Sequence, residues 1–175
     1  MGLKIWLPLN GNIENQGLAD VTITNNGATV DNNGKIGKCY SFNGSSNYVQ
    51  LTNSIIEGKK PFTFSVWYKT TSGNSYYPII SVGTSSKGFT IHGSVNRLEG
   101  GNGTNHFDSS NHITEVSWGM WAHLAVTYDG TKIQSYLNGV PNANSLSWTY
   151  GFGTGNTTIK IGHFWGGYFK GYIND

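Results

Sequence analysis

Charged side chains and cysteine are both scarce in this chain of 175 residues. Charged residues make up 11% of the sequence, against about a quarter in an average soluble domain. Eleven Lys and Arg against nine Asp and Glu give a net charge of +2, and Arg97 is the only arginine. Nucleic-acid binding normally needs a dense cationic stripe, so this composition argues against a nucleic-acid partner. The single cysteine, Cys39, excludes an intrachain disulfide, and no Cys/His spacing resembles a zinc site.

Long apolar runs and helical periodicity are also missing. The opening apolar stretch, residues 3–7, stops at Pro8 and is too short for a signal-peptide core or a membrane span. We therefore expect no membrane partner and no cleaved signal in this chain. No window places apolar residues at helical spacing for more than one turn, which excludes a coiled coil or a helical bundle.

Turn signals and aromatic rings are abundant instead. Glycine accounts for 25 residues and aromatic side chains for 14% of the chain. Asn-Gly or Asp-Gly pairs, which tolerate the positive φ of tight turns, recur between short β-rich runs at the spacing of sandwich strands. We therefore expect one all-β domain over residues 1–175, a two-sheet antiparallel β-sandwich. The expected strands are Leu3–Leu7, Val21–Thr24, Cys39–Phe42, Tyr48–Leu51, Phe62–Lys69, Ile79–Val82, Phe89–His92, Ala122–Tyr128, Lys132–Leu137 and Thr157–Phe164.

Alternation separates an inner and an outer face in the longer strands. Residues 62, 64, 66 and 68 form one apolar stripe, and residues 122, 124, 126 and 128 form another. One sheet surface should therefore enter the core, while the other is polar and carries rings. Tyr128, which precedes Asp129-Gly130, is expected to anchor a corner.

Four segments in this order resemble the laminin-G-like domains of the concanavalin A-like lectin/glucanase superfamily. They are residues 37–44 with 48–51, residues 62–67, residues 121–130 running into 136–139, and residues 159–162 with 169–175. The resemblance implies a jelly roll of one convex and one concave sheet, of the type found in bacterial or phage surface proteins. Extracellular surface or virion is the implied location.

The resemblance also implies that a last strand should follow the motif ending at Asp175. Its absence from residues 1–175 predicts either an incomplete sheet edge or self-association through that edge, because an unpaired edge invites pairing.

The resemblance implies a calcium site. It would join Asp175 to the backbone of Asn43 and Gly44, with Asn10 as a further ligand. Asn replaces an acid at positions 10 and 43, so we expect weak binding or an empty site.

Catalysis is not predicted. A retaining glycosidase needs two carboxyls about 5–5.5 Å apart, and no two acids here lie at i, i+2 or i, i+4. A pair assembled across strands is the alternative that spacing does not test. No serine lies in a Gly-x-Ser-x-Gly elbow.

A non-catalytic carbohydrate-binding or adhesion module is the expected function. Sugar C–H faces pack on aromatic rings while polar side chains bind the hydroxyls. A structural or assembly module of a virion or surface fibre is the alternative, and a glucanase-like hydrolase is the third. The candidate ligand-binding residues are Tyr76, Tyr77, His92, Arg97, Trp118, Trp148, Tyr150, Trp165 and Tyr168. Low charge favours a neutral glycan or surface polymer over an anionic one.

Overall fold

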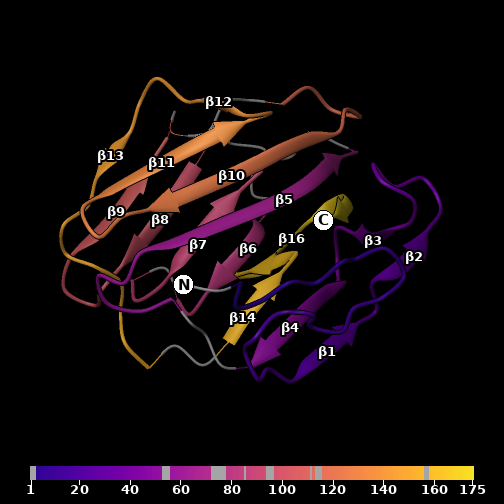
Figure 1. Cartoon of the computed structure of the whole chain (residues 1–175), viewed down its shortest axis with the longest axis horizontal. Coiled ribbons are helices and arrows are strands. Elements are labelled where there is room, and N and C mark those ends of the chain that lie inside the picture. Colours follow the sequence, from indigo (N-terminus) through magenta and orange to yellow (C-terminus); the bar gives the residue numbers. More distant parts are fainter. Residues whose placement is uncertain are drawn as a thin grey trace.

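Two antiparallel β-sheets stacked face to face make up the protein (Figure 1). The structure is a computed structural model that describes residues 3–52, 56–71, 78–84, 86–93, 97–110, 112, 116–155 and 158–175. In Figure 1, β5, β10 and β11 of one sheet pass in front of β6 and β7 of the other. This arrangement confirms the predicted all-β sandwich. Among the described residues there is no helix of the length and apolarity that a membrane span requires.

The first sheet, called sheet A, has seven strands within the described residues. In spatial order they are β1 (Ile23–Asn26), β4 (Tyr48–Thr52), β14 (Thr158–Ile161), β6 (Pro78–Val82), β7 (Phe89–His92), β8 (Arg97–Gly101) and β9 (His106–Ser109). The core side chains of β4 and β7 include Val49, Leu51, Phe89 and Ile91. Gln50 and Thr90, which alternate with them, point away from the core.

The second sheet, called sheet B, covers the other side of the core. Its strands in spatial order are β12 (Val140–Pro141), β11 (Lys132–Leu137), β10 (Ala122–Tyr128), β5 (Phe62–Thr70), β17 (Lys170–Asn174), β3 (Cys39–Asn43) and β2 (Thr29–Asp31), with β13 (Leu146–Ser147) beside β11. Burial alternates along all of β10, as the sequence predicts. The Tyr128 hydroxyl donates a 2.9 Å hydrogen bond to the carbonyl of Gly130, which confirms the predicted corner.

Three predicted strands differ from the structure, and the one expected at Val21–Thr24 is shifted to Ile23–Asn26. Residues 3–7 form no strand, because the backbone N–H of Trp6 donates to the Asn15 side chain at 2.8 Å instead of to a neighbouring strand. The single strand predicted up to Phe164 is divided at Gly162, whose φ of +83° turns the chain into a separate hairpin. Thr157 lies outside the described residues.

The final strand lies inside sheet B, between β5 and β3. Asn174 at its end pairs with Trp67 in the middle of β5. Residues 62–66 of β5 consequently pair with β10 alone among the described strands. The exposed Asp175 that follows accepts a hydrogen bond from the Trp6 indole nitrogen.

Candidate ligand-binding site

The hairpin of β15 (His163–Phe164) and β16 (Gly167–Tyr168) carries the most exposed large apolar side chain among the described residues. Trp165 at its tip is 82% exposed. Its backbone φ is +48° and that of Gly166 is +79°. Positive φ costs a bulky residue about 1–2 kcal/mol. The fold therefore holds a tryptophan in solvent at a position where glycine or asparagine would be easier to accommodate.

Polar and aromatic contacts fix this hairpin on the outer face of sheet A. The Ser81 hydroxyl on β6 donates a 2.8 Å hydrogen bond to the carbonyl of His163. The Phe164 ring meets His92 of β7 edge to face, with 6.0 Å between ring centroids. Because Ser81 and His92 are both buried, the hairpin has an anchored base and a free tip.

Half-buried rings continue from the hairpin onto β4. The His163 ring lies 4.4 Å from Tyr168 and 5.1 Å from Tyr48, measured between centroids. The Lys160 ammonium lies 5.5 Å from the centre of the Tyr48 ring. Burial, and secondarily the charge of Lys160, lowers the pKa of His163. The His163 ring is therefore neutral at pH 7, when one ring nitrogen can accept a hydrogen bond.

A row of polar side chains crosses the same outer face in strand register. Thr90 on β7 pairs with Ser81 on one side and with Glu99 of β8 on the other. The Thr90 side chain is fully buried, and its hydroxyl has no hydrogen-bond partner in the described part of the chain. The complete row, called the polar row, is Gln50, Lys160, Ser81, Thr90, Glu99 and Asp108.

The polar row contains a cross-strand carboxyl pair that spacing in the sequence does not reveal. Glu99 lies directly opposite Asp108. Arg97 forms ion pairs with both carboxylates, at 3.2 Å to Glu99. His92 Nε2 lies 3.7 Å from the other Glu99 oxygen. Register partners are about 5 Å apart at Cβ, close to the spacing of a retaining glycosidase. However, Glu99 is only 5% exposed, and one guanidinium holds both this buried acid and the exposed Asp108, so this geometry is that of an ion-pair cluster.

Several predicted ligand-binding residues lie at one end of sheet A. His92 and Arg97 close the turn between β7 and β8, beside Phe164. Trp165 and Tyr168 belong to the hairpin itself. His92 is only 1% exposed, so the prediction that it contacts ligand is corrected to a role beneath the hairpin. Tyr76 and Tyr77 lie outside the described residues.

Trp118 occupies a turn at the same end of the sandwich. It is 60% exposed, and the next residue, Gly119, donates a backbone hydrogen bond to Thr70 at the end of β5. The backbone N–H of Thr71 bonds the carbonyl of Lys170, two residues after Tyr168. The turn therefore lies where β17 begins, just beyond the hairpin.

Trp148 and Tyr150 lie at the opposite end, so they do not join the hairpin. Tyr150 is 57% exposed, but Trp148 is only 4% exposed. The Trp148 ring packs 4.7 Å from Phe107 and 6.2 Å from Phe152. Its indole N–H donates to the carbonyl of Gly151. A ring with both faces packed in the core offers no surface to a sugar, and Trp148 is therefore reassigned to the core.

The predicted calcium ligands are not brought together. Asn43 pairs with Lys170 at the start of β17, whereas Asp175 follows the end of that strand. At about 3.3 Å per residue, the two positions lie roughly 16 Å apart. The Asn43 side-chain oxygen accepts the backbone N–H groups of residues 45, 46 and 47, so it caps its own turn. Within the described ranges no three His, Cys, Asp or Glu side chains form a metal-binding group.

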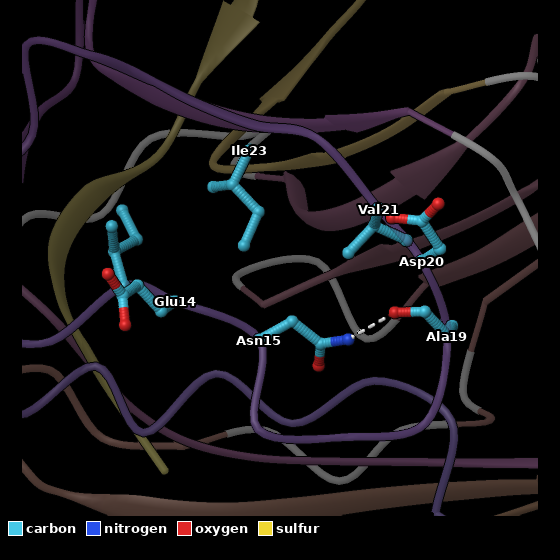
Figure 2. Close-up of a pocket in the computed structure, with 7 residues that line it drawn as sticks. Glu14, Asn15, Ala19, Asp20, Val21 and Ile23 are labelled. Atoms are coloured by element: carbon cyan, nitrogen blue, oxygen red, sulfur yellow. Dashed lines mark hydrogen bonds between the residues drawn. The ribbon is translucent and has the colours of Figure 1, made fainter.

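A hollow of about 380 Å³ lies apart from this site, in the loop before β1 (Figure 2). Figure 2 shows Glu14 and Asp20 on opposite sides of it, with Asn15 between them. The Asn15 side-chain amide donates a 2.7 Å hydrogen bond to the carbonyl of Ala19. The side-chain oxygen of Asn15 accepts hydrogen bonds from the backbone N–H groups of Trp6 and Gly17. Among the residues that the structure describes, no aromatic ring lines the hollow. We therefore place the candidate site at the hairpin.

Sequence reasoning missed Tyr48, Lys160, Ser81 and the partnership of Glu99 with Asp108. One signal was present: Val49 and Leu51 alternate with Tyr48 and Gln50, which predicts that Tyr48 faces outward. The remaining relationships depend on register between strands far apart in the sequence.

Two stacked antiparallel sheets define the protein as a jelly-roll β-sandwich. Residues 43–175 match the sequence profile of the concanavalin A-like lectin/glucanases superfamily. The chain belongs to this superfamily, as the sequence resemblance predicts. No curated protein gives a significant match.

Solved structures show the same fold at low sequence identity. Domain 4 of AbnA, a GH43 extracellular arabinanase from Geobacillus stearothermophilus, was solved in complex with arabinotriose; it has a TM-score of 0.71 and 21% identity, over 89% of this chain and 80% of that one. The heptameric SAP-like pentraxin from Limulus polyphemus has a TM-score of 0.55 and 20% identity, over 77% of this chain and 72% of that one. The enzymatically active domain of bacteriophage CBA120 tailspike protein 2 has a TM-score of 0.64 and 13% identity, over 87% of this chain and 27% of that one.

Proposed function

We propose that this protein is a non-catalytic carbohydrate-binding module whose contact surface is the Trp165 hairpin together with Tyr48, Lys160 and Tyr168. The observation that carries the proposal is Trp165 itself, which is 82% exposed at positive φ on an anchored hairpin. Backbone strain that surrounding contacts maintain is a mark of functional positions. A pyranose or furanose ring would stack on the indole, while Lys160 and Tyr168 would bind its hydroxyls.

A neutral glycan suits this surface. The cation of the hairpin site is Lys160, and its ammonium already lies over Tyr48. Arg97 is held by Glu99 and Asp108. The hairpin surface therefore recognises shape and hydroxyl groups more than charge, at an extracellular surface or on a virion.

A glycan array that includes arabinotriose tests the proposal, since the similar AbnA domain was solved with that sugar. Wild-type protein should bind at least one neutral glycan, and Trp165→Ala should weaken that binding roughly 30-fold, as for an aromatic hot spot worth about 2 kcal/mol. Tyr150→Ala is the matched control, because it removes an exposed ring at the opposite end. Equal losses in both variants would contradict the proposed surface.

An assembly module is the second candidate, because Trp118 and Met120 add exposed apolar side chains at the same end, 60% and 61% exposed. An assembly role predicts a symmetric contact larger than about 1,000 Å² that buries Trp165. Light scattering separates the two functions: Trp165→Ala would dissociate an oligomer in one case and leave the mass unchanged in the other.

A further inference from the structure

The outer face of sheet B carries a second group of rings, on the side of the molecule opposite the Trp165 hairpin. Three half-buried rings lie on this outer face: Trp67 on β5, Trp121 just before β10, and Tyr172 on β17. Tyr172 pairs with Lys69 in strand register. With Lys35 from the loop after β2, these residues form a surface that we call the lysine–aromatic face.

Both lysines of this face rest on aromatic rings. The Lys69 ammonium lies 4.6 Å from the centre of the Tyr172 ring and 5.3 Å from that of Trp121. The Lys35 ammonium lies 4.9 Å from the centre of the Trp67 ring. Attraction to the negative ring faces restricts where each ammonium can lie. Each cation is thus held over a half-buried ring.

Positive charge on this face is not neutralised within the described part of the chain. Neither Lys35 nor Lys69 forms an ion pair there. Asp31 on β2, in the same sheet, accepts two hydrogen bonds from Asn33 with its carboxylate. By contrast, acids engage Arg97 in the polar row of sheet A.

We propose that the lysine–aromatic face binds an acidic saccharide. The sugar's C–H face would stack on Trp121 or Trp67, and its carboxylate would meet the ammonium of Lys69 or Lys35. Single-stranded nucleic acid also combines rings with cations, but its affinity grows with the number of phosphates neutralised. Two lysines on rings and a net charge of +2 favour the saccharide. This inference concerns the other sheet and does not depend on the hairpin site.

Calorimetric titration with polygalacturonate, which has one carboxylate per sugar, tests the proposal. Fully methyl-esterified polygalacturonate is the neutral match. Wild-type protein should bind the acid form more tightly than the ester, and binding should weaken between about 20 mM and 150 mM salt. Lys69→Met keeps the apolar stem and should reduce affinity roughly five- to tenfold. Lys35→Met is a second variant with the same expected direction.

Lys160→Met is the matched control, because it removes an ammonium that also lies over a ring, Tyr48, but on sheet A. This variant and Trp165→Ala should retain wild-type affinity for polygalacturonate, which separates failure of this site from failure of the hairpin site. Near-ultraviolet circular dichroism verifies that each variant is folded. Equal affinity for acid and ester, equal losses in Lys69→Met and Lys160→Met, or tighter binding of an oligothymidylate would each overturn the proposal.

Discussion

Ser81 and His163 are joined by a 2.8 Å hydrogen bond that ties sheet A to the hairpin carrying Trp165. Ser81 is only 3% exposed, so water competes little for this bond. Losing it should cost about 1 kcal/mol of hairpin stability. We predict that Ser81→Ala weakens glycan binding several-fold although no ring is removed, as titration calorimetry would measure.

Thr90→Val is the matched control for that variant. Thr90 is buried beside Ser81 in the polar row, but its hydroxyl makes no hydrogen bond to the described residues. The valine variant should therefore bind the glycan as wild type does. Equal losses from the two substitutions would show that the Ser81 bond does not hold the hairpin in its binding position.

Trp148→Ala should destabilise the fold by about 3–5 kcal/mol, because a large buried ring leaves a cavity among Phe107, Tyr150 and Phe152. Urea unfolding followed by circular dichroism gives the free energy. Trp165→Ala should leave stability unchanged or raise it slightly, since alanine lies at the same positive φ with less steric conflict. A similar loss in both variants would contradict the contrasting placement of the two rings.

We predict that the turn between β10 and β11, which contains Asp129, becomes less stable in acid. Its carboxylate accepts hydrogen bonds from both donors of Thr131 and from the N–H of Lys132, and these bonds lower the pKa of Asp129. The folded pKa lies below the unfolded value of about 3.9. The stabilisation is therefore fully present above the unfolded value and is lost as the pH falls through the folded value.

Comparing wild type with Asp129→Asn shows this linkage. The variant should unfold at lower urea concentration at pH 7, and the difference should shrink toward about pH 2 as the wild-type carboxylate becomes protonated. Urea titrations at several pH values provide the measurement. A difference that stayed constant over this range would assign the effect to turn geometry instead of to charge.

Chelation of calcium is expected to leave the melting temperature unchanged. Asn43 on β3 pairs with the start of β17, whereas Asp175 follows the end of β17. Calcium that bound only the folded state through both residues would otherwise stabilise the fold. Differential scanning calorimetry with EDTA or with excess calcium makes the comparison. A rise of several degrees in calcium that Asp175→Asn abolishes would show that these ligands come together after all.

The edge of β5 predicts concentration-dependent self-association. Residues 62–66 pair with β10 alone among the described strands, and open edges recruit further strands. Light scattering should show mass increasing with protein concentration, and Thr63→Lys should reduce it by placing a charge on the edge. Thr127→Lys is the control, because Thr127 lies opposite Thr63 on a strand that is paired on both sides. Wild-type protein that stays monomeric at all concentrations would exclude this mode of association.

Much of the fold was readable from local pattern. Period-two alternation in residues 122–128 predicted both the strand and its inner face, because side chains alternate across a sheet. The Asn138-Gly139 turn was equally readable, since both residues adopt positive φ, +51° and +83°. The segment from residue 3 to residue 7 is also rich in apolar residues yet forms no strand, because its backbone bonds the irregular loop of residues 15–19 instead of a neighbouring strand.

By itself, the sequence determined the all-β class and the inner faces of the long strands, since both follow from the spacing of residues close together in the chain. Its composition also determined the high content of aromatic residues. Tertiary structure alone decided which rings are presented to solvent. Trp148 and Trp165 both lie in glycine-containing loops, yet one is packed among core rings and the other stands on a hairpin tip. Burial and register depend on contacts between distant strands, so no local pattern could distinguish these two tryptophans or place Glu99 opposite Asp108.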